Sequence, residues 1–258
     1  MNFIRRGSGK PLLLVHGLGG SWRSWNPVLE ALAAQRDVIA IDLPGFGATP
    51  PLPSAPTFLG LADAVEAFLR EHEFTGIDVV GSSMGARLVL ELARRNLVGA
   101  SIALDPGGFW RGWEESLFAT SIGASMKLIR ALQPVLPLLT ANPVTRTALF
   151  AQFSARPWAL PAQLALDELR TFAASPSFDA VLEDLVTGPR QAGAPAGTLR
   201  APLVIGWGRA DRVCLPRQAE RALAAFPDAR LHWFDGSGHF PQWDVPVESV
   251  RLILQTTV

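Results

Sequence analysis

The chain has 258 residues, of which 48% are hydrophobic, and this length suits one large α/β domain or one domain that carries an insertion. Its 23 Lys and Arg residues balance its 23 Asp and Glu residues, so no overall field points to a nucleic acid, an anionic membrane surface or a polyanionic substrate. The single cysteine, Cys214, excludes an internal disulfide and a cysteine-based metal cluster.

The apolar runs of the sequence do not indicate a signal peptide or a membrane span. The apolar run at residues 12–15 is too short for the core of a signal peptide, and no stretch approaches the roughly eighteen apolar residues of a membrane span. Together with the lone cysteine, this predicts a cytoplasmic protein without a membrane or nucleic-acid partner. The oligomeric state is not readable from the sequence.

Strands and helices alternate through the first part of the chain. Strands are predicted at residues 2–6, 11–15, 38–41, 77–80 and 100–104, and helices at residues 21–34, 57–71 and 86–95. Ser21 and Thr57 are predicted to cap two of the helices. Such alternation is typical of a mostly parallel, doubly wound sheet that is covered by helices on both faces.

The alternation stops in the middle of the chain and then resumes. Residues 109–197 contain no convincing strand, only segments with a helical pattern that are rich in Ala, Leu, Phe and Pro. Strands are predicted again at residues 202–207 and 230–234, with helices near residues 217–226 and 245–255. The sequence therefore predicts a core of residues 1–108 and 198–258 with a helical cap inserted at residues 109–197.

One pentapeptide carries the strongest chemical signal. Gly81-Ser82-Ser83-Met84-Gly85 lies between a predicted strand and a predicted helix. Glycines two places before and after a serine permit a turn so sharp that the serine hydroxyl is exposed, which is the nucleophile elbow. The glycines are centred on Ser83 rather than on Ser82, so Ser83 is the predicted nucleophile.

Serine chemistry requires a base, an acid that orients the base, and N–H donors for the oxyanion. His239 and Asp211 each follow a late predicted strand, where ligands bind in open α/β sheets, and the order Ser83, Asp211, His239 fits the hydrolase arrangement. The N–H groups of Leu18 and Met84 are the predicted oxyanion hole.

In these motifs the chain resembles the α/β-hydrolase fold family, in particular the cap-bearing carboxylesterases, lactonases and meta-cleavage-product hydrolases. The segments that carry the resemblance are His16-Gly17-Leu18-Gly19-Gly20, Asp42-Leu43-Pro44-Gly45-Phe46-Gly47, the Ser83 pentapeptide, Gly208-Arg209-Ala210-Asp211 and Gly238-His239. The family inserts its lid after the sixth strand, and this implies the same place for residues 109–197. The family also opens with two antiparallel strands, and the short N-terminal stretch here predicts that the first of them is missing or very short.

Alternatives remain for several of these residues. Asp105, which follows an earlier predicted strand, could orient His239 in place of Asp211, or could serve only as a hinge of the cap. His16 is interpreted as a residue that shapes the oxyanion loop by hydrogen bonding, and Cys214 as a buried hydrophobic side chain. Asp244, five residues after His239, is interpreted as a turn or helix-cap residue.

The nucleophile restricts the reaction. Members of the family that cleave haloalkanes or epoxides carry an aspartate at the elbow, so the serine argues against both reactions. No metal cluster and no dinucleotide motif are visible, and we expect a reaction without a cofactor. Trp110, Trp113 and Trp158 are predicted to bind an apolar substrate, while Phe118, Met126, Leu128, Phe150, Phe153 and Phe172 could line the pocket or form the cap core.

These observations predict a serine hydrolase that cleaves carboxylic esters of small to medium apolar molecules. Hydrolysis of a C–C bond in a meta-cleavage product, hydrolysis of a lactone, and a haloperoxidase or perhydrolase activity are alternatives on the same three residues. A non-catalytic ligand receptor is an alternative of a different class. The substrate depends on how the cap packs over Ser83, and that packing cannot be read from the sequence.

Overall fold

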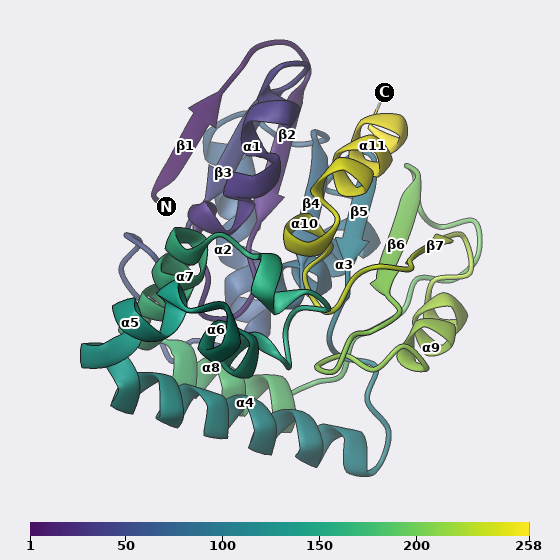
Figure 1. Ribbon diagram of the computed structural model, residues 1–258. Helices are drawn as coiled ribbons and strands as arrows, with labels where there is room; N and C mark the ends of the chain where they lie inside the picture. The colour runs from purple at the N-terminus through teal and green to yellow at the C-terminus, as the bar shows by residue number, and fades with distance from the viewer. Residues whose placement is uncertain (258) are drawn as a thin grey trace.

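A computed structural model describes residues 1–257, and a seven-stranded sheet forms the centre of the molecule (Figure 1). The strands are β1 (Phe3–Arg6), β2 (Pro11–Val15), β3 (Asp37–Ile41), β4 (Asp78–Ser82), β5 (Ser101–Leu104), β6 (Leu203–Gly208) and β7 (Arg230–Phe234). Their order across the sheet is β1-β3-β2-β4-β5-β6-β7, in which β1 is antiparallel to β3 and all other pairs are parallel. The predicted α/β fold with a mostly parallel sheet is confirmed.

The edge strand β1 is the part of the sheet for which the sequence did not give a clear prediction. It pairs with β3 from Phe3 opposite Ile41 to Arg6 opposite Val38. Within residues 1–257 no strand precedes it, so the sheet opens with one antiparallel strand instead of two. The helical insertion consequently follows the fifth strand of this sheet, β5, which is the sixth strand in the family's count.

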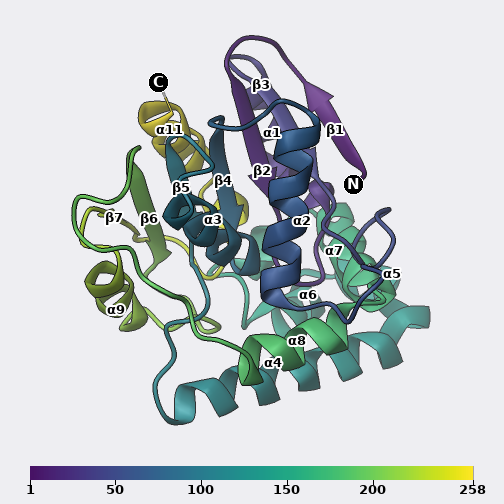
Figure 2. The ribbon, with the colours of Figure 1, turned by 180° about the vertical axis from the view of Figure 1, so that it is seen from behind.

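Helices cover both faces of the sheet. On one face lie the 3₁₀ helix η1 (Trp22–Trp25), α1 (Asn26–Ala33), α10 (Pro241–Asp244) and α11 (Pro246–Thr256), and on the other face lie α2 (Phe58–Glu71) and α3 (Met84–Arg94) (Figures 1 and 2). A further helix, α9 (Gln218–Ala225), packs beside β6 and β7. Thr57 Oγ1 accepts a hydrogen bond from Gly60 N, and Ser21 Oγ accepts one from Arg23 N, so both predicted caps form.

The two faces explain why the strands are continuous apolar runs. Leu12 and Leu14 of β2 contact the cluster that includes α1 and α11, whereas Leu13 and Val15 contact the cluster that includes α2 and α3. All four side chains are fully buried. A strand that is covered on both sides shows no alternation of polar and apolar residues.

The chain between β5 and β6 forms five α-helices and two 3₁₀ helices, and we call helices α4 to α8 the cap. They are α4 (Trp113–Leu132), α5 (Leu136–Ala141), α6 (Pro143–Phe150), α7 (Ala162–Ala174) and α8 (Phe178–Thr187), with η2 (Gln133–Val135) and η3 (Pro157–Ala159) between them. The cap lies across the end of the sheet at which the parallel strands finish (Figures 1 and 2).

A buried hydrogen bond between two side chains joins the cap helix α7 to the core. Ser24 Oγ, in η1, donates a hydrogen bond to Glu168 Oε2, in α7, at 2.9 Å. Burial raises the pKa of Glu168 to about 8, and the hydrogen bond from Ser24 opposes that shift. The Glu168 carboxyl group is therefore largely protonated at neutral pH.

Within residues 1–257 no helix combines the length and the apolar character that a membrane span requires. The cytoplasmic location stays a prediction.

Candidate active site

Ser83 lies at a sharp turn between β4 and α3. Its backbone has φ 57° and ψ −117°, a conformation that non-glycine residues adopt rarely and at an energetic cost. The turn needs its flanking glycines, because a Cβ on Gly81 would lie 2.2 Å from the carbonyl oxygen of Gly85. The sequence thus folds into the predicted elbow, with Ser83 at the apex.

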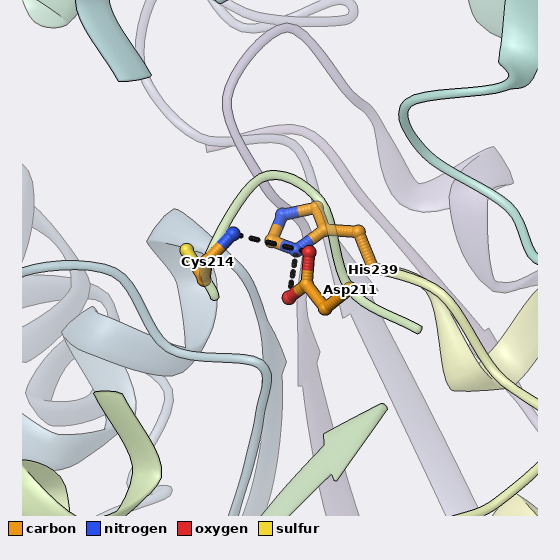
Figure 3. Close-up of side chains that lie close together, drawn as sticks. All are labelled: Asp211, Cys214 and His239. Carbon is orange, nitrogen blue, oxygen red and sulfur yellow. Dashed lines mark hydrogen bonds and ion pairs between the residues drawn. The ribbon is translucent and has the colours of Figure 1, made fainter. Parts of the chain in front are cut away.

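Ser83, His239 and Asp211 form a chain of hydrogen bonds. Ser83 Oγ lies 2.8 Å from His239 Nε2, and His239 Nδ1 lies 2.8 Å from Asp211 Oδ2. Because a carboxylate only accepts, Nδ1 carries the proton and Nε2 is free to accept the Ser83 hydroxyl proton. Figure 3 shows the Asp211 carboxylate directed at the His239 ring. The structure thus brings together the three side chains that the sequence singled out.

Asp211 has a fixed orientation. Its other oxygen, Oδ1, accepts the backbone N–H groups of Val213 at 2.7 Å and Cys214 at 3.0 Å. Figure 3 shows the bond from Cys214 N to the carboxylate. A carboxylate that is held by two N–H groups keeps its second oxygen in place for the imidazole.

Asp105, the alternative acid, lies beside this group but has no hydrogen bond to His239. Its Oδ1 accepts the backbone N–H of Gly208 at 2.8 Å. Burial raises the pKa of Asp105 well above its usual range, and the nearby Asp211 carboxylate raises it further. The raised pKa of Asp105 thus disfavours a second negative charge beside Asp211.

Ser82 is also separate from the base. It is buried, and its hydroxyl accepts a hydrogen bond from Gln242 Nε2 at 3.0 Å. Of the two serines in the elbow, Ser83 is the one that contacts His239.

The loop that carries Leu18 lies directly against Ser83. A Cβ on Gly17 would be only 3.0 Å from Ser83 Cβ, so the loop approaches this closely because residue 17 is glycine. Leu18 lines the same cavity as Ser83, and Met84 N is the first N–H of α3. An N–H at a helix start has no partner within the helix and can bind an anion. The two residues that carry the predicted oxyanion donors, Leu18 and Met84, therefore line the same cavity as Ser83.

His16 holds that loop in shape. Its Nε2 accepts the Leu43 N–H at 3.0 Å, so its Nδ1 carries the proton and donates to Gly17 O at 2.7 Å. Burial lowers the pKa of His16 and keeps the ring neutral. Both ring nitrogens are engaged, which agrees with a positioning role rather than with a role as base.

Above Ser83 a cavity separates the core from the cap. It holds about 600 Å³ of space, part of it open to solvent. Its wall is apolar apart from a few groups, and the side chains that line it include Leu18, Met84, Trp110, Phe118, Ile122, Met126, Ile129, Phe153, Phe172, Phe178, Leu185, Val213 and Phe240. A cavity of this kind suits an apolar ligand with few polar groups.

Of the three tryptophans that were predicted to bind substrate, one lines the cavity and two lie outside it. Trp110 lines the cavity and is 4% exposed. Trp113 is 59% exposed and packs against Arg217, and Trp158 is 56% exposed at η3, so neither reaches the cavity. Both rings lie exposed outside the cavity that Ser83 lines, which corrects the expectation that Trp113 and Trp158 bind the substrate there.

The other side chains that were expected to line the pocket or form the cap core also occupy different places. Phe118, Met126, Phe153 and Phe172 line the cavity, whereas Leu128 is exposed and Phe150 is buried in the cap core. Sequence reasoning missed Phe178, Ile122 and Ile129, whose helical spacing shows a buried face but not which neighbour it contacts. It also missed Arg87, a buried cation in the cavity wall.

The His239 loop is tied to the cap through Asp244. Asp244 Oδ2 accepts the N–H of Gly238 at 2.7 Å and the N–H of Ala155, in the cap segment after α6, at 2.8 Å. Ser154 Oγ donates to the other carboxylate oxygen, and His239 N donates to Phe153 O at 2.8 Å. Asp244 thus links the His239 loop to the cap, and its interpretation as a turn or helix-cap residue was too limited.

Asp211, Cys214 and His239 are the one group of potential metal ligands found within residues 1–257. The Asp211 oxygens already accept three hydrogen bonds, and His239 Nε2 faces Ser83. Burial raises the pKa of the Cys214 thiol, which disfavours the thiolate that metals bind. These donors fit the hydrogen-bonded chain better than a metal ion, and a reaction without a cofactor stays a prediction.

A mostly parallel sheet with a serine, a histidine and an aspartate at its carboxyl end is the arrangement of an α/β hydrolase. A sequence profile described as "Alpha/beta hydrolase family" matches residues 12–252. The chain belongs to this family of hydrolases.

Known proteins support the same assignment. The chain is 29% identical to an uncharacterized protein of Mycobacterium tuberculosis, over 96% of this chain and 75% of that protein. It is 26% identical to a 2-hydroxy-6-oxononadienedioate/2-hydroxy-6-oxononatrienedioate hydrolase of Cupriavidus pinatubonensis, over 90% of this chain and 81% of that one. The structure of a thermophilic esterase from Thermogutta terrifontis superposes with a TM-score of 0.76 at 19% identity, over 98% of this chain and 91% of that chain. At that identity the likeness concerns the fold.

Proposed function

We propose that this protein is a serine hydrolase that cleaves carboxylic esters of small to medium apolar molecules through an acyl-enzyme. The observation that carries the proposal is the pair of 2.8 Å contacts from Ser83 Oγ to His239 Nε2 and from His239 Nδ1 to Asp211 Oδ2, beneath an apolar cavity. This geometry activates a serine for attack on an acyl carbon.

The acylation step follows from the positions of these atoms. Ser83 Oγ attacks the ester carbonyl carbon while its proton moves to His239 Nε2. The carbonyl oxygen becomes an oxyanion and binds the N–H groups of Leu18 and Met84. When the tetrahedral intermediate collapses, the C–O bond breaks and the departing alcohol takes the proton from Nε2.

Deacylation repeats the sequence with water. His239 Nε2 accepts a proton from a water molecule, the water oxygen attacks the acyl carbon, and Ser83 Oγ leaves with the proton that Nε2 returns. Asp211 stabilises the imidazolium in both steps and keeps the proton on Nδ1. The products are an alcohol and a carboxylic acid.

The test is replacement of the nucleophile. Ser83→Ala should lower turnover of p-nitrophenyl esters by about a million-fold, to the residual rate of a site without its nucleophile. Circular dichroism should show that the fold survives, because alanine is smaller than serine. A phosphonate ester should label the wild-type protein on Ser83 and leave the variant unlabelled. Turnover that persists in Ser83→Ala would contradict the proposal.

A second candidate is hydrolysis of a C–C bond in a meta-cleavage product on the same three residues. The similarity to the 2-hydroxy-6-oxononadienedioate/2-hydroxy-6-oxononatrienedioate hydrolase of Cupriavidus pinatubonensis favours it. A panel of short esters, lactones and ring-fission products, compared by kcat/KM, separates the candidates. A preference for ring-fission products over every ester would replace the first proposal by the second.

A further inference from the structure

Arg87 is a charged residue inside the apolar cavity. It lies one helical turn beyond Ser83 on α3, and its backbone N–H donates to Ser83 O at 3.0 Å. Only 1% of the residue is exposed, and it belongs to the cavity wall. Residues four apart on a helix share a face. A cation thus lies on the same side of α3 as the nucleophile.

The Arg87 guanidinium is only partly satisfied. Nη2 donates to the carbonyl oxygen of Pro189, and the group stacks over the Phe58 ring at 4.0 Å from its centroid. Nε and Nη1 are buried and have no hydrogen-bond partner within residues 1–257.

No carboxylate of the described chain forms a hydrogen bond with this cation. Asp184 is the carboxylate that raises the pKa of Arg87 most, and its Oδ2 accepts a hydrogen bond from the Phe58 N–H. The carboxylate of Glu91, the next acid, accepts hydrogen bonds from Arg94 and Arg95. A buried charge without an anion is costly, and proteins bury such groups chiefly where a partner completes them.

A second buried donor without a partner within residues 1–257 belongs to the wall of the same cavity. Trp110 Nε1, in the wall of the same cavity, is also buried without a partner in the described chain. Two consecutive glycines leave room for these side chains. A Cβ on Gly107 would lie 3.3 Å from the Trp110 ring, and one on Gly108 would lie 2.9 Å from Arg87 Nε. Two side chains of the largely apolar cavity wall, one of them charged, thus carry buried N–H groups without a partner in the described chain.

We propose that the substrate carries a carboxylate, which binds Arg87 and the Trp110 N–H while its apolar part fills the cavity and its ester carbonyl faces Ser83. The inference rests on the proposed ester hydrolysis and narrows its substrate class to esters with an anionic end. A carboxylate accepts several hydrogen bonds and carries a negative charge. It therefore supplies the acceptors and the counter-charge that the Arg87 guanidinium lacks.

The experiment compares charged and neutral substrates of equal length. Two charged series carry the carboxylate in different halves of the ester: p-nitrophenyl monoesters of succinic, glutaric and adipic acid, and acetate esters of ω-hydroxy acids. The neutral partner of each compound has a methyl ester in place of the carboxylate. The measured quantity is the ratio of kcat/KM for the charged substrate to that for its neutral partner.

The wild-type protein should favour the charged member in at least one series. Arg87→Met, which removes the charge and keeps an unbranched apolar side chain, should lower that ratio by about ten- to a hundred-fold, the worth of hydrogen bonds to a charged group. Arg87→Lys should keep most of the ratio, because it keeps the cation. The series that responds shows in which half of the ester the carboxylate lies.

Two results would overturn the inference. One is an equal ratio in the wild type and Arg87→Met, which would assign Arg87 to packing against Phe58 or to a water shared with Gln191 Oε1, an acceptor that is also unpartnered in the described chain. The other is a wild-type preference for neutral esters in both series, which decides the question even if Arg87→Met does not fold. Either result leaves ester hydrolysis intact, whereas failure to cleave any ester of either series would overturn both proposals.

Discussion

At the scale of single residues, opposite predictions follow for Asp211 and Asp105, the two buried aspartates that the sequence offered as partners of His239. Asp211→Asn should lower kcat by about ten thousand-fold, because an asparagine amide in that place favours the histidine tautomer with the proton on the wrong nitrogen. The KM for a p-nitrophenyl ester should change little, since the cavity is intact. Steady-state kinetics checks both values.

Asp105→Asn is the matched control for that variant. An asparagine keeps the oxygen that accepts the Gly208 N–H, and it replaces a carboxyl group whose ionisation burial disfavours. Its kcat should therefore stay within about ten-fold of the wild type. An Asp105→Asn variant as inactive as Asp211→Asn would show that both acids serve His239.

The sequence placed the catalytic candidates well because their roles impose local rules. An elbow needs glycines at fixed positions around Ser83, and a base and an acid in this fold follow the late strands, so spacing and order identify Asp211 and His239. No such rule marks Arg87, which occupies an ordinary position inside a helix and becomes unusual only through burial. The same holds for Trp113 and Trp158, because aromatic character does not say which way a ring points.

At the scale of elements, the approach of α3 to the sheet depends on one glycine. A Cβ on Gly85 would lie 2.2 Å from Val15 O and 2.4 Å from His16 O, both backbone atoms that cannot rotate away. Gly85→Ala should therefore reduce the free energy of unfolding by about 3 kcal/mol, as overpacking does, and displace the oxyanion loop. Urea unfolding measures the first effect and ester turnover the second.

Gly123→Ala provides the comparison within another helix. Gly123 lies inside α4, and a Cβ there would meet no atom within 4 Å. This substitution should increase the free energy of unfolding by about 0.5–1 kcal/mol, because glycine is unfavourable inside a helix. Equal stabilities of the two variants would contradict the role assigned to Gly85.

The strands and most core helices could be predicted because burial leaves a regular pattern. The run at Leu12 to Val15 is apolar on both faces, and Thr57 caps α2 where a polar residue precedes a helical pattern. The cap helices could be predicted as helices but not placed. Each carries an apolar face, and whether that face meets another cap helix or the cavity depends on contacts between distant segments.

At the scale of the whole molecule, the contact between Glu168 and Ser24 should make stability depend on pH. The pKa of Glu168 is about 8 in the folded protein and about 4.5 ordinarily, so between these values the folded state binds more protons than the unfolded state. Stability should then be greatest below about pH 4.5 as far as this group is concerned, and it should decrease as the pH rises to about 8.

Glu168→Gln should remove this dependence. The glutamine side chain keeps an oxygen that can accept a hydrogen bond from the Ser24 hydroxyl, and it cannot ionise. The variant should match the wild type near pH 5 and be more stable near pH 9, by on the order of a few kcal/mol. Thermal unfolding from pH 5 to 9 measures the difference, and Glu183→Gln, on the exposed side of α8, should follow the wild type. Parallel curves for Glu168→Gln and the wild type would show that Glu168 ionises without cost.

The bonds that join Asp244 to Gly238, Ala155 and Ser154 have a consequence for how the enzyme matures. The loop that presents His239 takes its shape partly from the chain after α6, which reaches it only when the cap has docked. A core that has folded without its middle segment would hold Ser83 at the elbow but lack a fixed base beside it. Activity should therefore be the last property to appear during folding.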